Sequence, residues 1–121
     1  MSSEITNNFI SKLFKLVNRT NTLIYTVEAD RPITIIGGSL SILTDDSEVI
    51  DFSVISGSIT YIILRNHRID NNTPSQFIES IKRLVLNPGD QIYVQAKNSY
   101  GISSLPEIHG HISFVRQPKL V

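Results

Sequence analysis

The sequence predicts an all-β protein, an antiparallel β-sandwich of the jelly-roll or immunoglobulin-like type with a short N-terminal arm. Runs rich in β-branched and aromatic residues recur along the chain, and clusters of Gly, Pro, Asn, Asp and Ser separate them. In residues 91–97, Ile92, Val94 and Ala96 alternate with polar residues, which is the period of a strand with one buried face. No long amphipathic helix interrupts these runs, so a parallel βαβ arrangement is disfavoured.

The chain divides into an N-terminal arm over residues 1–19, a sandwich domain over residues 20–116 and a C-terminal tail over residues 117–121. Apolar residues in the arm recur at helical spacing, whereas residues 10–17 also alternate like a strand. We expect an arm that is helical at first and packs on another surface. The alternative is an ordinary amphipathic element of the same domain. The apolar residues that form a candidate assembly interface are Ile5, Phe9, Ile10, Leu13 and Phe14.

Within the sandwich domain, enrichment in β-branched and aromatic residues marks further strands. These predicted strands cover residues 22–29, 33–41, 49–55, 59–66 and 107–116. Gly37 and Gly38 interrupt the second of them, which predicts a bulge or a bend there. The run 59–66 is almost continuously apolar and therefore predicts a central strand that is covered on both faces. Residues 67–75 and 98–105 are expected to form exposed loops.

Asn87-Pro88-Gly89-Asp90 predicts a tight turn. Pro88 presets φ for the second position of the turn, and Gly89 tolerates the positive φ that a type II turn needs next. Apolar residues of the predicted strands should form the core. The residues expected to be largely buried are Ile35, Leu40, Ile50, Phe52, Ile62, Leu64, Leu86, Ile92, Val94, Ile112 and Phe114.

The composition narrows the classes of function. Eleven Lys and Arg residues balance eleven Asp and Glu residues, which disfavours a nucleic-acid-binding surface over the whole domain. The chain has no Cys, which excludes disulfides and thiolate metal sites. The longest apolar run is far shorter than the roughly 20 residues of a membrane-spanning helix, and no secretory signal pattern is present. We expect no cofactor, no direct contact with nucleic acid and no membrane association.

Two histidines are the clearest candidates for chemistry. His109 and His111 lie two residues apart in a predicted strand and share a face, a spacing that suits two metal ligands. Glu107 is the only nearby carboxylate in register, and a further local ligand is missing. We therefore expect two polar residues on the wet face of a strand and no metal ion.

A second group is acidic and comprises Asp45, Asp46, Glu48 and Asp51. It lacks the glycine-assisted spacing of a calcium-binding loop, so it predicts a solvated hairpin tip. No G-x-S-x-G motif marks a nucleophile. We predict that the protein is not an enzyme, and a small hydrolase or a cupin-like metal enzyme is the remaining catalytic alternative.

The order of the motifs is similar to that of a group of tailed-phage virion proteins built on one small β-sandwich. A T-x-x-Y-T-V strand occupies residues 22–27, and a hydrophobic strand leading to a polar edge occupies residues 33–41. The L-x-P-G-D turn is Leu86 to Asp90, an I-x-V strand follows at residues 92–94, and a last strand covers residues 107–116. The resemblance spans about residues 20 to 116, so it excludes the arm.

Two stretches depart from the pattern of this group. Glu28-Ala29-Asp30 stands where a Pro-Ala-Gly turn is more usual, and Asp45-Asp46 stands where an Asn-Thr/Ser stretch is typical. The resemblance implies a non-enzymatic role in the virion as a head decoration, neck or connector, or tail and baseplate adaptor protein. Such a protein is assembled in the host cytoplasm and contacts other virion proteins of the capsid, neck or tail.

The apolar residues of the arm and the zero net charge also favour a homo-oligomer. A second hypothesis from a different class is a carbohydrate- or receptor-binding module. In that case Tyr61, Tyr93 or Tyr100 would provide the surface on which a ligand stacks.

Overall fold

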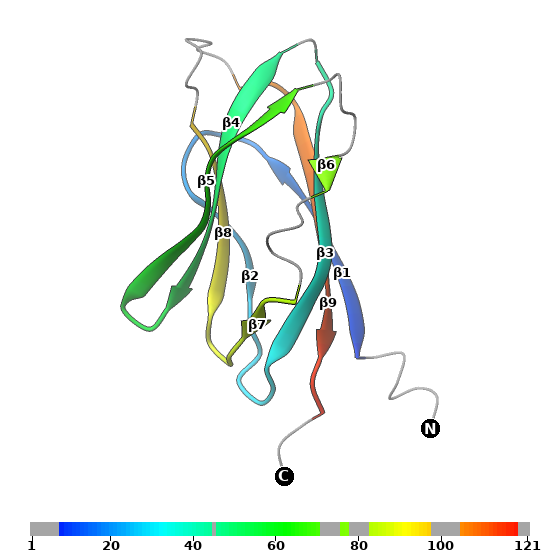
Figure 1. Cartoon of the computed structure of the whole chain (residues 1–121), viewed down its shortest axis with the longest axis vertical. Helices are drawn as coiled ribbons and strands as arrows, with labels where there is room; N and C mark the ends of the chain where they lie inside the picture. Colours follow the sequence, from blue (N-terminus) through cyan, green and yellow to red (C-terminus); the bar gives the residue numbers. More distant parts are fainter. Residues whose placement is uncertain (1–7, 45, 71–75, 78–82, 98–104, 119–121) are drawn as a thin grey trace.

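The structure is a computed structural model that describes residues 8–44, 46–70, 76–77, 83–97 and 105–118. Within these ranges all regular structure is β-strand, and no helix is present that is long and apolar enough to cross a membrane. The strands, labelled in Figure 1, are β1 (Phe9–Leu16), β2 (Thr22–Thr26), β3 (Ile33–Ile42), β4 (Ser47–Ser56), β5 (Ile59–Asp70), β6 (Gln76–Phe77), β7 (Val85–Leu86), β8 (Gln91–Ala96) and β9 (Ile108–Arg116).

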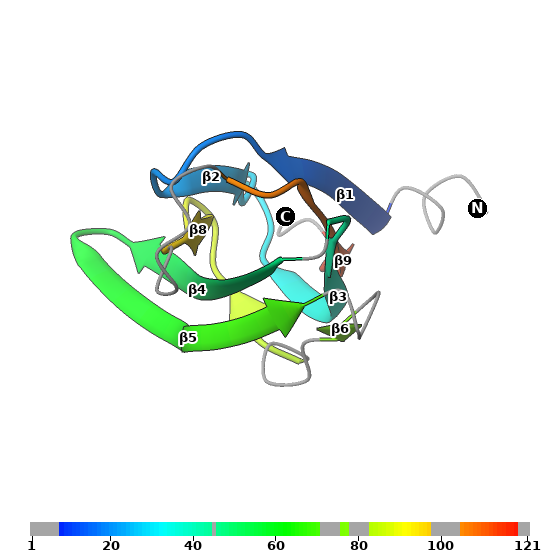
Figure 2. The ribbon, with the colours of Figure 1, turned by 90° about the horizontal axis from the view of Figure 1, so that it is seen from above.

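The strands form two antiparallel sheets that pack face to face, as the view from above in Figure 2 shows. The first sheet has the order β1-β9-β3-β6, and β7 also pairs with β3. The second sheet has the order β2-β8-β4-β5. This arrangement confirms the predicted antiparallel β-sandwich.

The core lies between the sheets and follows the period-two pattern of the strands. In β8, Ile92, Val94 and Ala96 are buried, as the alternation predicts. Residues from the inner faces of both sheets complete one continuous cluster. Apart from Ile62 and Leu64, every residue predicted to be buried belongs to this cluster.

The expectation of a central strand at residues 59–66 is wrong. β5 lies at the edge of the second sheet and pairs only with β4 among the described strands. Ile62 is 45% exposed and Leu64 is half-buried, because the β4–β5 hairpin extends away from the body of the sandwich (Figure 1). The strand also continues to Asp70, so the first residues of the predicted loop 67–75 belong to β5, where Ile69 is buried.

The predicted turn before β8 is present. Gly89 has φ of 88°, which confirms its positive φ, and the Asp90 N–H donates to the Asn87 carbonyl oxygen at 3.0 Å. The Gly89 N–H also donates to the Val27 carbonyl oxygen at 3.0 Å, which ties the turn to the end of β2. The predicted irregularity at the two glycines of β3 is present too, as a register shift between Ile35 and Gly37.

The N-terminal arm is not helical where the structure describes it. Residues Phe9–Leu16 form β1, which pairs with β9 from Phe9 opposite Val115 to Leu16 opposite Ile108. A strand puts every second residue on the core side, where Leu16 is buried. β1 is thus a strand of the first sheet, and the boundary at residue 19 stays a prediction about folding units.

Candidate functional site

The residues predicted for an assembly interface lie on both faces of β1. Phe9 and Leu13 point outward and are 55% and 78% exposed. Ile10 and Phe14 are half-buried and pack against the core, and Ile5 lies outside the described residues. The structure therefore divides the predicted apolar row between two faces, and the role of these residues in assembly stays a prediction.

Val17 belongs to the outward row but is not among the residues predicted for the interface. It follows β1 directly and is 72% exposed, so that Phe9, Leu13 and Val17 repeat every four residues. In a strand every second side chain points to the same face, so the alternation that starts at Phe9 identifies Val17 as outward-facing. We call these three side chains the β1 outer row.

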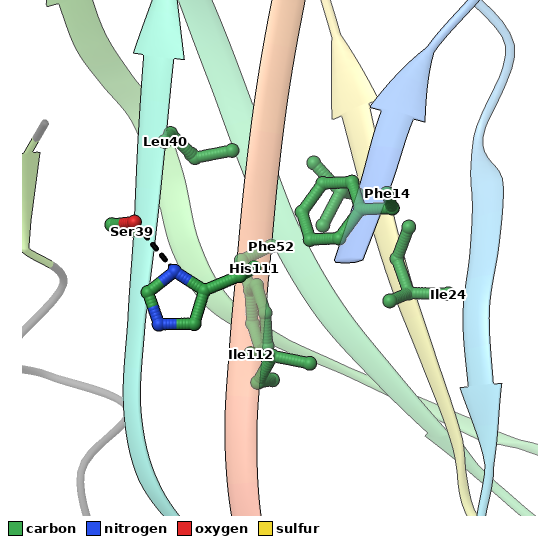
Figure 3. A pocket seen from close by; sticks show the side chains of 8 residues that line it. Phe14, Ile24, Ser39, Leu40, Phe52, His111 and Ile112 are labelled. Atoms are coloured by element: carbon green, nitrogen blue, oxygen red, sulfur yellow. Dashed lines mark hydrogen bonds between the residues drawn. The ribbon is translucent and has the colours of Figure 1, made fainter. Parts of the chain in front are cut away.

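Polar side chains join β1, β9 and β3 on the same outer face of the first sheet. The Ser11 and Ser113 hydroxyl oxygens lie 2.8 Å apart, and Ser39 Oγ lies 2.7 Å from His111 Nδ1. Figure 3 shows the second pair, with the His111 imidazole directed toward Ser39. These contacts fix the strands laterally and leave the β1 outer row beside a polar surface.

The two histidines share this face, as the spacing predicted. His109 Nε2 lies 3.0 Å from Glu107 Oε2, and Lys15 Nζ lies 3.8 Å from the same oxygen. His111 instead contacts Ser39, so the imidazoles have separate partners. Among the described residues, no group of three or more His, Cys, Asp or Glu side chains is placed to hold a metal ion.

β1 is held on the core by one aromatic ring. Phe14 lies opposite Gly110 of β9, and a Cβ atom at Gly110 would come within 2.5 Å of Phe14 Cζ and 2.9 Å of Leu40 Cδ2. The missing side chain of Gly110 thus provides the space for the ring. An apolar cavity of about 10 Å³ remains next to it (Figure 3), which is no larger than one water molecule and too small for a ligand.

The acidic residues of the predicted hairpin tip have different environments. Glu48 is buried, and its Oε2 accepts a hydrogen bond of 2.7 Å from Arg19 Nη1, so a solvated position is wrong for this residue. Asp51 pairs with Lys97 at 3.3 Å, and Asp46 accepts a hydrogen bond from Thr44. Asp45 lies outside the described residues.

The Arg19–Glu48 pair links the two sheets at one end of the sandwich. Arg19 follows β1, and Glu48 lies in β4. The Arg19 carbonyl oxygen also accepts a hydrogen bond of 3.1 Å from Gln95 Nε2 of β8. The chain after β1 is therefore fastened to two strands of the opposite sheet.

Further exposed apolar side chains lie on the β4–β5 hairpin, with Ile59 and Tyr61 on one face and Ile62 on the other. A groove of about 270 Å³ runs between this hairpin and the segment before β8. The residues that line it are Val54, Ser56, Tyr61, Ile63, Leu84, Val85, Leu86, Asn87 and Asp90.

Of the two tyrosines predicted as stacking surfaces that the structure describes, Tyr61 lines this groove and Tyr93 does not. Tyr93 is half-buried, and its hydroxyl group lies 3.3 Å from Gln91 Oε1. Tyr100 lies outside the described residues.

No protein-family profile matches the chain, and no curated protein matches it in sequence.

Proposed function

We propose that this protein is a non-enzymatic structural protein of a tailed-phage virion that forms symmetric contacts with itself and with neighbouring capsid, neck or tail proteins. The observation that carries the proposal is the β1 outer row, three large apolar side chains exposed along an edge strand. The order of strand and turn motifs in residues 20–116, similar to that of small virion sandwich proteins, supports the same class.

Large apolar side chains in water have an unfavourable hydration free energy, and three of them on one face of an edge strand, alternating with Ser11 and Lys15, favour an interaction surface. The row lies on a strand that is fixed by its pairing with β9, by the Phe14 ring and by the Arg19–Glu48 pair. A partner therefore meets a surface with a defined shape, which repeated contacts in a symmetric particle require.

The proposal is tested on particles induced from the host that carries the gene. Purified particles are separated on a density gradient, and the protein is quantified by mass spectrometry against the major capsid protein. We expect a fixed ratio of the two proteins through the particle peak. A protein that stays in the soluble fraction, with none in the particles, contradicts the virion role.

The groove at the β4–β5 hairpin favours a second candidate function, a carbohydrate- or receptor-binding module. Tyr61 provides an exposed ring beside Ser56, Asn87 and Asp90, and protein–sugar contacts combine such rings with polar groups. Glycan-array binding that is lost in Tyr61→Ala and kept in Ile59→Ala would support it. Equal binding by the two variants, or none by the wild type, would count against it.

A further inference from the structure

The outer edge of β1 is open in the described part of the chain. β1 pairs with β9 on one side, and no described strand pairs with its other side. The Arg116 N–H donates to the Asn8 carbonyl oxygen at 2.7 Å, and Asn8 lies one position before β1. In an antiparallel pair the hydrogen-bonded positions alternate, so the even-numbered residues of β1 bond to β9.

The odd-numbered residues of β1 therefore direct their N–H and C=O groups to the open edge. The next pair of strands is consistent with this assignment, because Leu43 N–H donates to the Glu107 carbonyl oxygen at 2.9 Å. That contact directs the odd-numbered residues of β9 to β3 and leaves the even-numbered ones for β1. An added strand would meet the peptide groups of Phe9, Ser11, Leu13 and Lys15.

We propose that the occupant of this edge is β1 of a second copy, antiparallel and related by a two-fold axis that passes beside Leu13. The inference rests on the proposed assembly function and names its contact. This pairing of the two β1 strands joins the first sheets of two copies into one continuous sheet. The outer rows of both copies then lie on the same face of that sheet.

The side chains select this register. A two-fold axis perpendicular to the sheet keeps each residue on its own face, so a residue meets one of the same parity. With the axis at Leu13, the outer-row residues meet apolar residues, as do Ile10 and Leu16, and each lysine meets an uncharged residue. The opposed pairs, the second residue being in the second copy, are Phe9 with Val17, Ile10 with Leu16, Ser11 with Lys15, Lys12 with Phe14, and Leu13 with itself.

The two neighbouring registers place less favourable side-chain pairs opposite each other. With the axis at Lys12, the two Lys12 ammonium groups lie directly opposite each other, and like charges in that position are destabilising. The same shift places Phe9 opposite Lys15. With the axis at Phe14, Leu13 meets Lys15, so the apolar contacts of the outer row are lost. The separation of like charges and the apolar contacts of the outer row thus favour the same register.

The absence of cysteine in the chain allows a direct test of this geometry. Leu13→Cys in the full chain places two thiols opposite each other, with Cα atoms about 5.5 Å apart, which a disulfide can span. We expect a disulfide-linked dimer under mild oxidation. Ile62→Cys is the matched control, since it replaces an exposed apolar residue on the other edge strand, and it should stay uncrosslinked.

Two further cysteine variants test the register. Ser11→Cys should not link to itself, because the two thiols would be about 13 Å apart along the strands. A mixture of Ser11→Cys and Lys15→Cys proteins, refolded together, should link, since these positions oppose each other. Self-linking of Ser11→Cys, or no linking of Leu13→Cys, overturns the proposed pairing.

Association without cross-linking is measured by light scattering and sedimentation. The wild type and Ile62→Lys should have the mass of two chains, and Leu13→Lys the mass of one. Circular dichroism of Leu13→Lys should match that of the wild type, because the side chain is outside the core. A wild type with the mass of one chain at high concentration, or a Leu13→Lys variant that associates equally well, overturns the inference.

These results separate the inference from the proposed function. Association that survives Leu13→Lys in a protein found in particles contradicts β1 pairing and leaves the virion role intact. Cross-linking of Leu13→Cys in a protein absent from particles supports the pairing and contradicts the virion role.

Discussion

β1 and β5 both lie at the edge of a sheet, and both carry large apolar side chains in contact with water. β1 pairs with β9 over eight positions without a register shift. β5 pairs with β4 through two register shifts, and Asn66 within it has a positive φ of 56°. Bulges at an edge obstruct the addition of another strand, whereas exposed charges occur on both edges, as Lys12 and Lys15 on β1 and as Arg65 and Arg68 on β5.

The difference between the two edges separates two kinds of apolar exposure. The regular edge of β1 offers peptide groups in a straight register, so its outer row is suited to contact another strand. The irregular edge of β5 is suited to present side chains such as Tyr61 to a ligand or a loop. Exposure alone does not distinguish these uses, whereas the backbone does.

The largest expected loss of stability follows from replacing Arg19, the arginine after β1. Arg68 inside β5 serves as the comparison. Arg19→Met leaves the buried Glu48 carboxylate without its 2.7 Å partner and should lower the free energy of unfolding by about 3–5 kcal/mol. Arg68 contacts Asp70 at 4.0 Å on the surface, so Arg68→Met should cost less than about 1 kcal/mol. Urea unfolding measures both, and equal losses would contradict the difference.

The next effect concerns the attachment of β1 to the core. Gly110→Ala forces the Phe14 ring or Leu40 to move and should cost about 1–3 kcal/mol. The cost should be smaller in a Phe14→Leu background, because the shorter side chain leaves room for the new methyl group. A double-mutant cycle measures this coupling. Additive effects of the two substitutions would show that the ring does not depend on Gly110.

A smaller effect is expected at two turns. Gly57, in the turn between β4 and β5, has φ of 63°, and Gly89, before β8, has φ of 88°. No atom lies within 4 Å of an added Cβ at either position, so backbone strain is the main cost. Gly57→Val and Gly89→Val should each cost about 1–2 kcal/mol. An unchanged melting temperature in either variant would show that its positive φ is not required.

The smallest effect is a pH dependence in β2. Burial raises the pKa of the Tyr25 phenol, and the nearby Glu28 carboxylate adds to the increase. The folded state therefore retains the phenol proton more strongly than the unfolded state. This contribution to stability is fully present below the ordinary phenol pKa and is lost as the pH rises through the higher pKa of the folded state.

Tyr25→Phe should therefore lose less stability than the wild type between neutral and strongly alkaline pH. Tyr61→Phe is the control, because that ring is exposed on the hairpin. Denaturation midpoints at several pH values measure the difference. Parallel profiles for the wild type and Tyr25→Phe would show that Tyr25 does not titrate differently in the two states.

Local patterns predicted much of the fold, and pairing partners explain the rest. The alternation in β8 and the glycine in its turn are local signals, and both predictions hold. The pattern of Phe9, Leu13 and Phe14 is compatible with a helix as well as with a strand. Pairing with β9, about a hundred residues away in the sequence, stabilises the strand. The apolar run in β5 suggested a covered strand because a sequence does not state which strand lies at an edge.

The sequence predicted the region of the candidate interface on β1 but not the set of residues that forms the β1 outer row. The region around Leu13 was identified from its apolar residues, yet helical spacing grouped Phe14 with the interface although its ring packs against the core. Val17 lies four residues after Leu13, a spacing that fits a helix as well as a strand, yet it was left out of the predicted interface. The open edge itself follows from the order of strands, which local periodicity does not contain.

The pairing of β1 with β9 also has a consequence for synthesis of the chain. Ser11 and Ser113 contact each other across 102 positions, so β1 finds its partner only after β9 has left the ribosome. The second sheet is complete by Ala96 and can form earlier. Contacts between such distant segments slow folding, and an unpaired strand invites aggregation in the meantime. Lys12 and Lys15 keep charge on β1 during this interval, when neither of its edges has a partner.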